Sequence, residues 1–86
     1  MFTPEFINEE RGEFLLVANH GLLSPESIRL SIAYNIARIG WGLSQLPPHI
    51  HTCRVVYDIR GQSIPDHVQA QVRQALEQVA IVEFKS

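Results

Sequence analysis

The chain is organised around residues 51–62, where a predicted strand runs into a glycine-containing turn. From residue 53 to residue 60, apolar or aromatic side chains at the odd positions alternate with mostly charged ones, the period of two that a strand requires. The strand ends at Gly61, which allows the backbone to turn with positive φ. Asp58, Arg60 and Gln62 therefore gather at one strand end, and open parallel sheets bind ligands at such an edge.

Two further apolar runs predict strands on either side of this central one. Residues 13–19 form a continuous apolar run that is short enough for a buried strand. Residues 80–85 alternate again and predict the last strand. A short strand over residues 5–7, paired with residues 13–19 through a turn at residues 8–12, would add a fourth strand.

Two helix starts separate the strands. Ser24 is expected to be the N-cap of the first helix, with Pro25 at its first position, and Pro47 ends it at the latest. This helix is expected to run to about Ile39, or as far as Leu46. Ser63 is the expected N-cap of a second, amphipathic helix that covers the sheet.

This order predicts an α/β or α+β fold in a single small domain. Strand, helix, strand, helix and strand should form a sheet of three or four mainly parallel strands with both helices packed on it. Residues 1–12 are expected to be an acidic lead-in and residues 13–86 the globular domain. With only 86 residues, the core is small.

The first helix is apolar on most of its surface. Ser31, Asn35 and Arg38 continue a narrow polar line at helical spacing, and two interpretations of it stay open: a solvated edge, or the lining of a substrate groove. Trp41 is predicted to fill the core.

Composition restricts the function. The net charge is −2, which argues against a simple nucleic-acid-binding module. Six of the seven basic residues are arginine, a residue suited to bidentate recognition of phosphate or carboxylate. The single cysteine, Cys53, excludes an internal disulfide and is expected to be a buried strand thiol. No apolar run is long enough for a membrane span, no DNA-specific motif is present and no cofactor is predicted.

Four chemical interpretations remain open from the residues alone. A metal nuclease would use Asp66 or Asp58 with Glu83 and Lys85; a nucleotide-binding turn would use the lone Gly61, far from a glycine-rich fingerprint. A metal-independent ribonuclease needs a base, an acid and a cation for the phosphate. A non-enzymatic binding module needs none of these. His49 and His51 lack a third ligand nearby in sequence, so no metal site is predicted.

A resemblance favours the third interpretation. The segment VVYDIRGQ (residues 55–62), followed by a helix and the strand VEFK, is similar to the C-terminal toxin domains of bacterial polymorphic and contact-dependent growth-inhibition toxins. The segment LLSPESIRLSIAYNIARIG (residues 22–40) resembles the preceding helix of such domains. Members of this group are often ribonucleases that act on tRNA and are neutralised by a cognate immunity protein. The resemblance implies delivery from a secreted bacterial parent protein into the target-cell cytoplasm.

The resulting hypothesis is an antibacterial toxin domain that cleaves tRNA without a metal. Arg60 and Arg54 would hold phosphate, His20 or His51 would act as base or acid, and Asp58 would orient an arginine or a histidine. The remaining substrate-binding candidates are Gln62, Tyr57 and Arg38. The alternative is a non-enzymatic interaction domain, cytoplasmic in that case, that docks on a partner protein.

Overall fold

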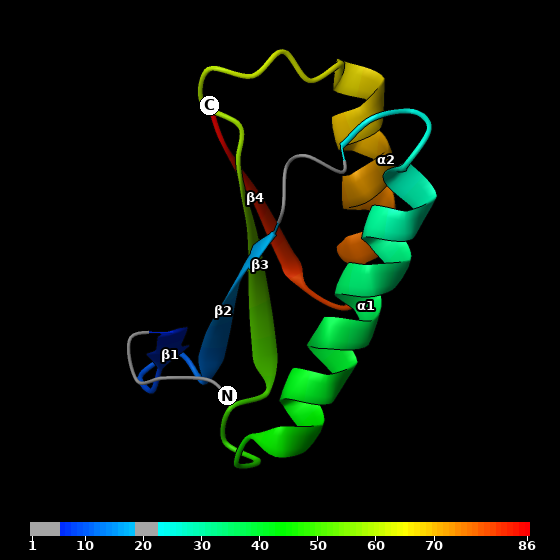
Figure 1. Cartoon of the computed structure of the whole chain (residues 1–86). Helices are drawn as coiled ribbons and strands as arrows, with labels where there is room; N and C mark the ends of the chain where they lie inside the picture. Colours follow the sequence, from blue (N-terminus) through cyan, green and yellow to red (C-terminus); the bar gives the residue numbers. More distant parts are fainter. Residues whose placement is uncertain (1–5, 19–22) are drawn as a thin grey trace.

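The computed structural model describes residues 6–18 and 23–86, and in these it contains two helices and a four-stranded mixed sheet (Figure 1). The elements are β1 (Ile7–Asn8), β2 (Glu13–Ala18), α1 (Ile28–Gln45), β3 (Thr52–Asp58), α2 (Asp66–Leu76) and β4 (Ile81–Lys85). The predicted fold class is confirmed. Neither described helix is long and apolar enough to cross a bilayer.

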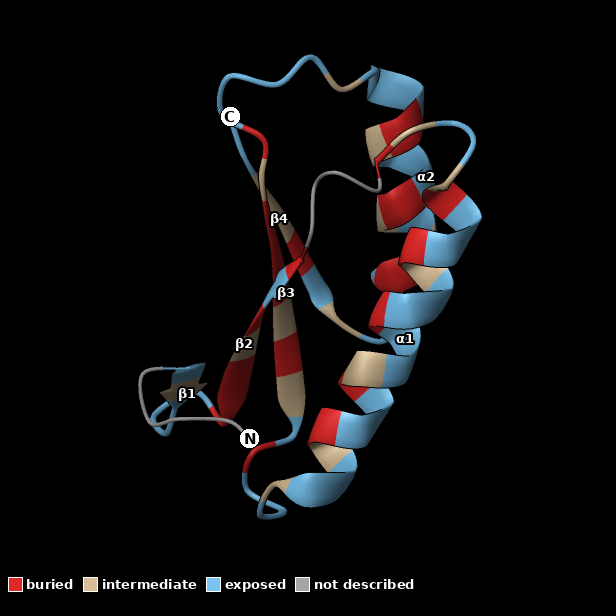
Figure 2. Cartoon of the chain, viewed as in Figure 1, coloured by how far each residue is buried: buried red, intermediate tan, exposed pale blue. Residues whose placement is uncertain are grey.

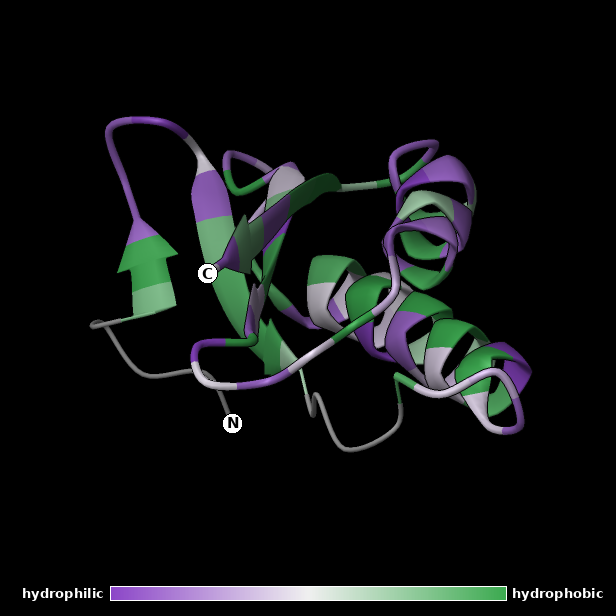
Figure 3. Cartoon of the chain, turned by 90° about the horizontal axis from the view of Figure 1, so that it is seen from above, coloured by the Kyte–Doolittle hydropathy of each residue, from purple (hydrophilic) through white to green (hydrophobic). Residues whose placement is uncertain are grey.

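The sheet follows the order of the chain. β1 pairs antiparallel with β2, and β2, β3 and β4 are parallel neighbours, with Leu16 opposite Val55 and Val55 opposite Val82. Because consecutive parallel strands lie side by side, two crossovers of the same hand place both helices on one face of the sheet (Figure 3). No described element covers the other face, although parallel sheets are usually covered on both.

The core lies between the sheet and the two helices (Figure 2). Alternate residues of each strand point toward the helices, as the period of two requires. Tyr57 stacks on Phe84 of β4, with ring centroids 5.1 Å apart. The fully buried side chains are Phe14, Ser31, Ile39, Cys53, Val55, Tyr57, Val68, Val72 and Leu76.

Two of the three residues in the polar line of α1 face inward, so they neither form a solvated edge nor line an open groove, while Arg38 is half-buried beside them. Ser31 and Asn35 are buried, and the Asn35 amide donates to the Tyr57 hydroxyl at 2.9 Å; the Ser31 hydroxyl lies 3.4 Å from the same oxygen. A buried tyrosine hydroxyl needs a hydrogen-bond partner, and this side of α1 supplies it. The prediction that Trp41 fills the core was also wrong, because its side chain is 53% exposed.

Both helices begin later than predicted. The N-cap of α1 is Ser27 rather than Ser24; the two serine hydroxyls lie 2.6 Å apart, in a turn that precedes the helix. α2 begins at Asp66 with Pro65 at its N-cap, not with Ser63. Pro65 has an extended ψ of 143°, so the residues before it, Ser63 included, lie outside the helix.

The Cys53 thiol is buried, as predicted, and burial raises its pKa to about 12. Since the thiolate is the reactive form, we expect a disulfide-exchange reagent at pH 8 to modify the native chain at least 100-fold more slowly than the unfolded chain. The measurement is absorbance of the released thiol with and without guanidinium. Complete labelling of the folded chain within minutes would contradict the buried position of this thiol.

Candidate functional site

The predicted site residues fall into two groups at opposite ends of β3. The carboxyl end carries Asp58 and then Arg60 and Gln62, while His51 precedes the amino end. The strand between them has seven residues, so the two groups lie roughly 20 Å apart at about 3.3 Å per residue. His20 lies outside the described residues.

At the carboxyl end, Asp58 and Arg60 form a bidentate ion pair. Arg60 donates from Nε to Oδ1 of Asp58 at 2.9 Å and from Nη2 to Oδ2 at 2.6 Å, and its backbone N–H adds a bond of 3.2 Å. These bonds, together with Lys85 opposite on β4, lower the pKa of Asp58 to about 2. A phosphate could therefore bind the Arg60 guanidinium only by displacing the Asp58 carboxylate from it.

At the amino end, two histidines help to hold the β1–β2 turn. His49 lies 2.6 Å from the carboxylate of Glu9, and the backbone N–H groups of His51 and Thr52 both donate to the Gly12 carbonyl oxygen. The His51 ring contacts the Thr52 hydroxyl at 3.0 Å. These contacts join the turn to β3.

The candidate substrate-binding residues are dispersed. Arg54 lies on the bare sheet face and donates to Glu13 at 2.9 Å, a bond that raises its pKa. The Tyr57 hydroxyl is directed into the core. Arg38 bonds the Val17 carbonyl oxygen at 3.4 Å and lies over the Tyr34 ring. Gln62 is exposed in the turn after β3. Among the candidates that the structure describes, only Asp58, Arg60 and Gln62 share one strand end.

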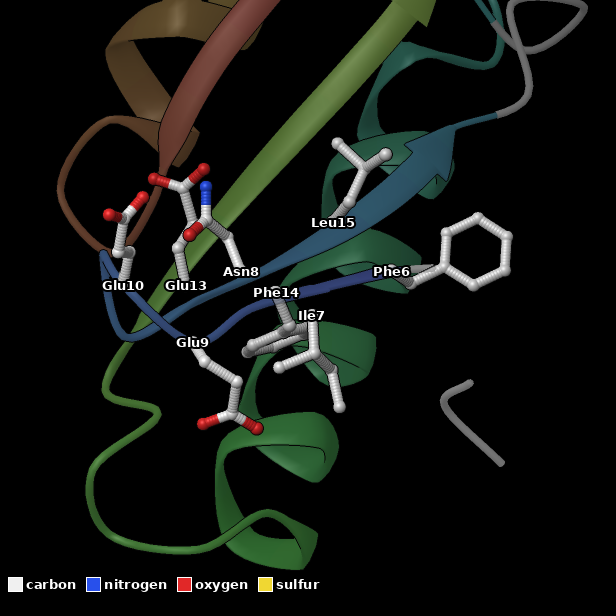
Figure 4. Close-up of a pocket in the computed structure, with 8 residues that line it drawn as sticks. All are labelled: Phe6, Ile7, Asn8, Glu9, Glu10, Glu13, Phe14 and Leu15. Carbon is white, nitrogen blue, oxygen red and sulfur yellow. The ribbon is translucent and has the colours of Figure 1, made fainter. Parts of the chain in front are cut away.

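A hollow of about 600 Å³ lies beside the β1–β2 hairpin, lined by residues 6–10 and 13–15 (Figure 4). Asn8, Glu13 and Leu15 rise on one side of the hairpin, while Ile7 and Phe14 point to the other. The hollow also contains the carboxylates of residues 9 and 10. An acidic and apolar lining repels phosphate, so this hollow is not suited to RNA.

Within the described part of the chain, no three His, Cys, Asp or Glu side chains gather as a metal site requires. Asp58 and Glu83 share the bare face of the sheet, but Glu83 lies opposite Val56, and Lys85 lies opposite Asp58. Asp66 opens α2, on a different element. The carboxylates of the metal-nuclease interpretation are therefore not assembled in the described residues.

The comparisons with known proteins found no matching family model, no matching curated protein and no matching solved structure. The residues themselves therefore carry the functional argument, and the toxin resemblance stays a prediction.

The surface that sequence reasoning missed is the exposed side of α1, which we call the solvent half of α1. Leu30, Tyr34, Ile36 and Trp41 are 65, 55, 43 and 53% exposed there. Between them lie the exposed small residues 33, 37 and 40. The amino-acid sequence contained a signal for this surface. Residues 30, 34, 37 and 41 have the spacing by which a helix presents one apolar seam to a partner helix.

The solvent half of α1 is almost uncharged. Across the whole of Ile28–Gln45 the only charged residues are Arg29 and Arg38, and Arg38 is half-buried at the border of this surface. Surface helices normally place charged residues on the side that faces water. Large contiguous apolar surfaces are uncommon on soluble monomers, and interaction sites are one setting in which they occur.

Proposed function

We propose that this chain is a non-enzymatic protein-interaction domain that docks through the solvent half of α1. The carrying observation is the exposure of three large apolar side chains, Leu30, Tyr34 and Trp41, along one side of an 18-residue helix. Burying such side chains on a partner is favourable by about 25 cal/mol for each Å² removed from water. The proposal follows the alternative that the sequence left open.

The arrangement of the ionisable groups that the structure describes supports this function over catalysis. Asp58 holds Arg60 in a bidentate pair and Glu13 holds Arg54, so a phosphate would have to compete with a carboxylate for each guanidinium. His51 lies at the opposite end of β3. A general acid–base mechanism requires its groups within hydrogen-bond reach of one substrate, or one water away.

Photo-crosslinking tests the docking surface. A photoreactive amino acid in place of Ala37 is expected to give covalent adducts with protein in cells, and the same residue in place of Ala70 is the control. Both alanines are exposed and helical, but Ala70 lies on α2. Adducts at position 37 should disappear when Tyr34→Glu is added. Equal adducts at both positions, or none at position 37, would refute this docking surface.

A metal-independent tRNA ribonuclease, acting as an antibacterial toxin opposed by an immunity protein, is the second candidate. The observation that favours it is the cationic carboxyl edge, where Arg60 and Lys85 lie on adjacent chain segments. Induced expression of the wild type beside Arg60→Ala, with total tRNA resolved on a gel, separates the two functions. The interaction domain leaves tRNA intact, whereas growth arrest with tRNA fragments that Arg60→Ala abolishes would establish the ribonuclease.

A further inference from the structure

We infer that Arg73 prevents strand addition at the outer edge of β4, and that the strand it excludes is β4 of a second copy of this chain. The inference concerns a different surface from the solvent half of α1 and does not depend on the proposed function. β4 is the last strand of the sheet, with β3 as its one strand neighbour among the described residues. Backbone groups of an edge strand pair with another chain unless something covers them.

Hydrogen-bond direction identifies the backbone groups at this edge. The Ile59 N–H donates to the Lys85 carbonyl oxygen, so the backbone of Lys85 is directed toward β3. Backbone direction alternates along a parallel strand, so the N–H and C=O groups of Val82 and Phe84 are directed away from β3. A further strand would therefore pair with β4 at these two residues.

Arg73 of α2 lies over this edge. Its Nη1 donates to the Val82 carbonyl oxygen at 3.1 Å, and the guanidinium lies over the Phe84 ring, 5.0 Å from the centroid. Glu77, one turn later on α2, pairs with the same nitrogen at 3.5 Å. A strand that adds to β4 would thus meet a charged group on the carbonyl oxygen that its own N–H requires.

The charges of β4 indicate which strand fits this edge. In an antiparallel pair of β4 strands centred on Phe84, Glu83 of each copy faces Lys85 of the other. Two pairs of opposite charge then form across the interface, and such cross-strand pairs are stabilising. The two Phe84 backbones face each other, as a hydrogen-bonded pair requires. A pair centred on Glu83 would instead place two carboxylates directly opposite each other, which is destabilising.

Arg73 opposes this pairing in the native chain. The Cα atoms of the two Phe84 residues would lie about 5.5 Å apart, which brings the two guanidinium groups over their rings close together. These groups repel, and each already occupies a Val82 carbonyl oxygen. One short strand offers far less than a standard interface of about 800 Å² per partner. Without Arg73 we therefore expect a weak dimer, with a dissociation constant on the order of 100 μM.

Sedimentation equilibrium of the full chain, from about 5 to about 500 μM, tests Arg73. The wild type should stay near 9.8 kDa, and Arg73→Ala should rise toward twice that mass. Arg11→Ala removes the same charge from an exposed position near the other edge of the sheet, and it should behave as the wild type. Circular dichroism checks folding, and Arg73→Met serves if alanine is not tolerated. A folded Arg73 variant that keeps the wild-type mass would overturn the inference.

Lys85→Glu tests the register. Added to Arg73→Ala, it places carboxylates opposite each other twice and should raise the dissociation constant about 10-fold or more. In a register centred on residue 83, position 85 faces Ile81, and this change would have no such effect.

A mixture tests the pairing of the two strands. Arg73→Ala/Lys85→Glu mixed with Arg73→Ala/Glu83→Lys should recover the dimer, because two lysines on one strand then face two glutamates on the other. No recovery would overturn the β4 pair. A wild type that self-associates, and loses this association on Lys85→Glu, would overturn the role of Arg73.

Discussion

Replacing Tyr57 with alanine is expected to lower the free energy of unfolding by about 3–5 kcal/mol. The ring is fully buried and stacked on Phe84, so truncation leaves a cavity in the centre of the sheet. It also removes the acceptor of the Asn35 amide, a buried donor that would then be unsatisfied. Since small domains have only about 5–15 kcal/mol of stability, this loss removes a large share of it and should lower the urea midpoint clearly.

Two further tyrosine variants separate the contribution of the Tyr57 ring from that of its hydroxyl and from the effect of removing an exposed ring. Tyr57→Phe keeps the ring and removes the hydroxyl, and it should cost about 1–3 kcal/mol. Tyr34→Ala, on the exposed side of α1, loses only its contact with Arg38 and should cost less than about 1 kcal/mol. Urea denaturation followed by circular dichroism at a few micromolar measures all three. A loss in Tyr57→Ala no larger than in Tyr34→Ala would refute the buried position of Tyr57.

Gly12→Ala should lower the free energy of unfolding by about 2–4 kcal/mol. Gly12 has φ of +62°, and a Cβ there would lie 2.4 Å from the His49 carbonyl oxygen. The Gly12 carbonyl oxygen accepts two backbone bonds, from His51 and Thr52, so the turn cannot move away without losing them. The variant therefore combines a left-handed backbone, which costs about 1–2 kcal/mol for an L-residue, with a steric clash against main chain.

Gly61→Ala is the matched control. Gly61 has φ of +77°, but no other described atom lies within 4 Å of an added Cβ. Only the backbone cost of about 1–2 kcal/mol should appear there. The same urea titration of both variants isolates the effect of the His49 contact. An equal loss of unfolding free energy in the two variants would show that residue 12 does not lie against the His49 carbonyl oxygen.

The sequence by itself determined the order of the main elements and favoured a parallel sheet over an antiparallel one without deciding between them. The alternation over residues 53–60 and the helix stop at Pro47 depend on neighbours along the chain, and local sequence records such patterns directly. Chain order then makes parallel neighbours the natural arrangement for strand-helix-strand units. These features required no knowledge of the packing.

Only the tertiary structure decided which side of α1 is buried. Both sides of α1 are apolar enough to pack on the sheet, so the hydrophobic periodicity of the sequence did not distinguish them. The decision depends on Tyr57, whose buried hydroxyl needs the Asn35 amide 22 positions away and thereby turns Leu30 and Trp41 to the solvent.

The candidate site was decided in the same way. Sequence placed polar residues near strand ends, and the length of the predicted central strand already separates His51 from Arg60. Only the tertiary structure shows that Arg54 reaches Glu13, 41 positions away on the neighbouring strand. Local sequence does not contain such pairings, because they depend on contacts between elements that are distant along the chain.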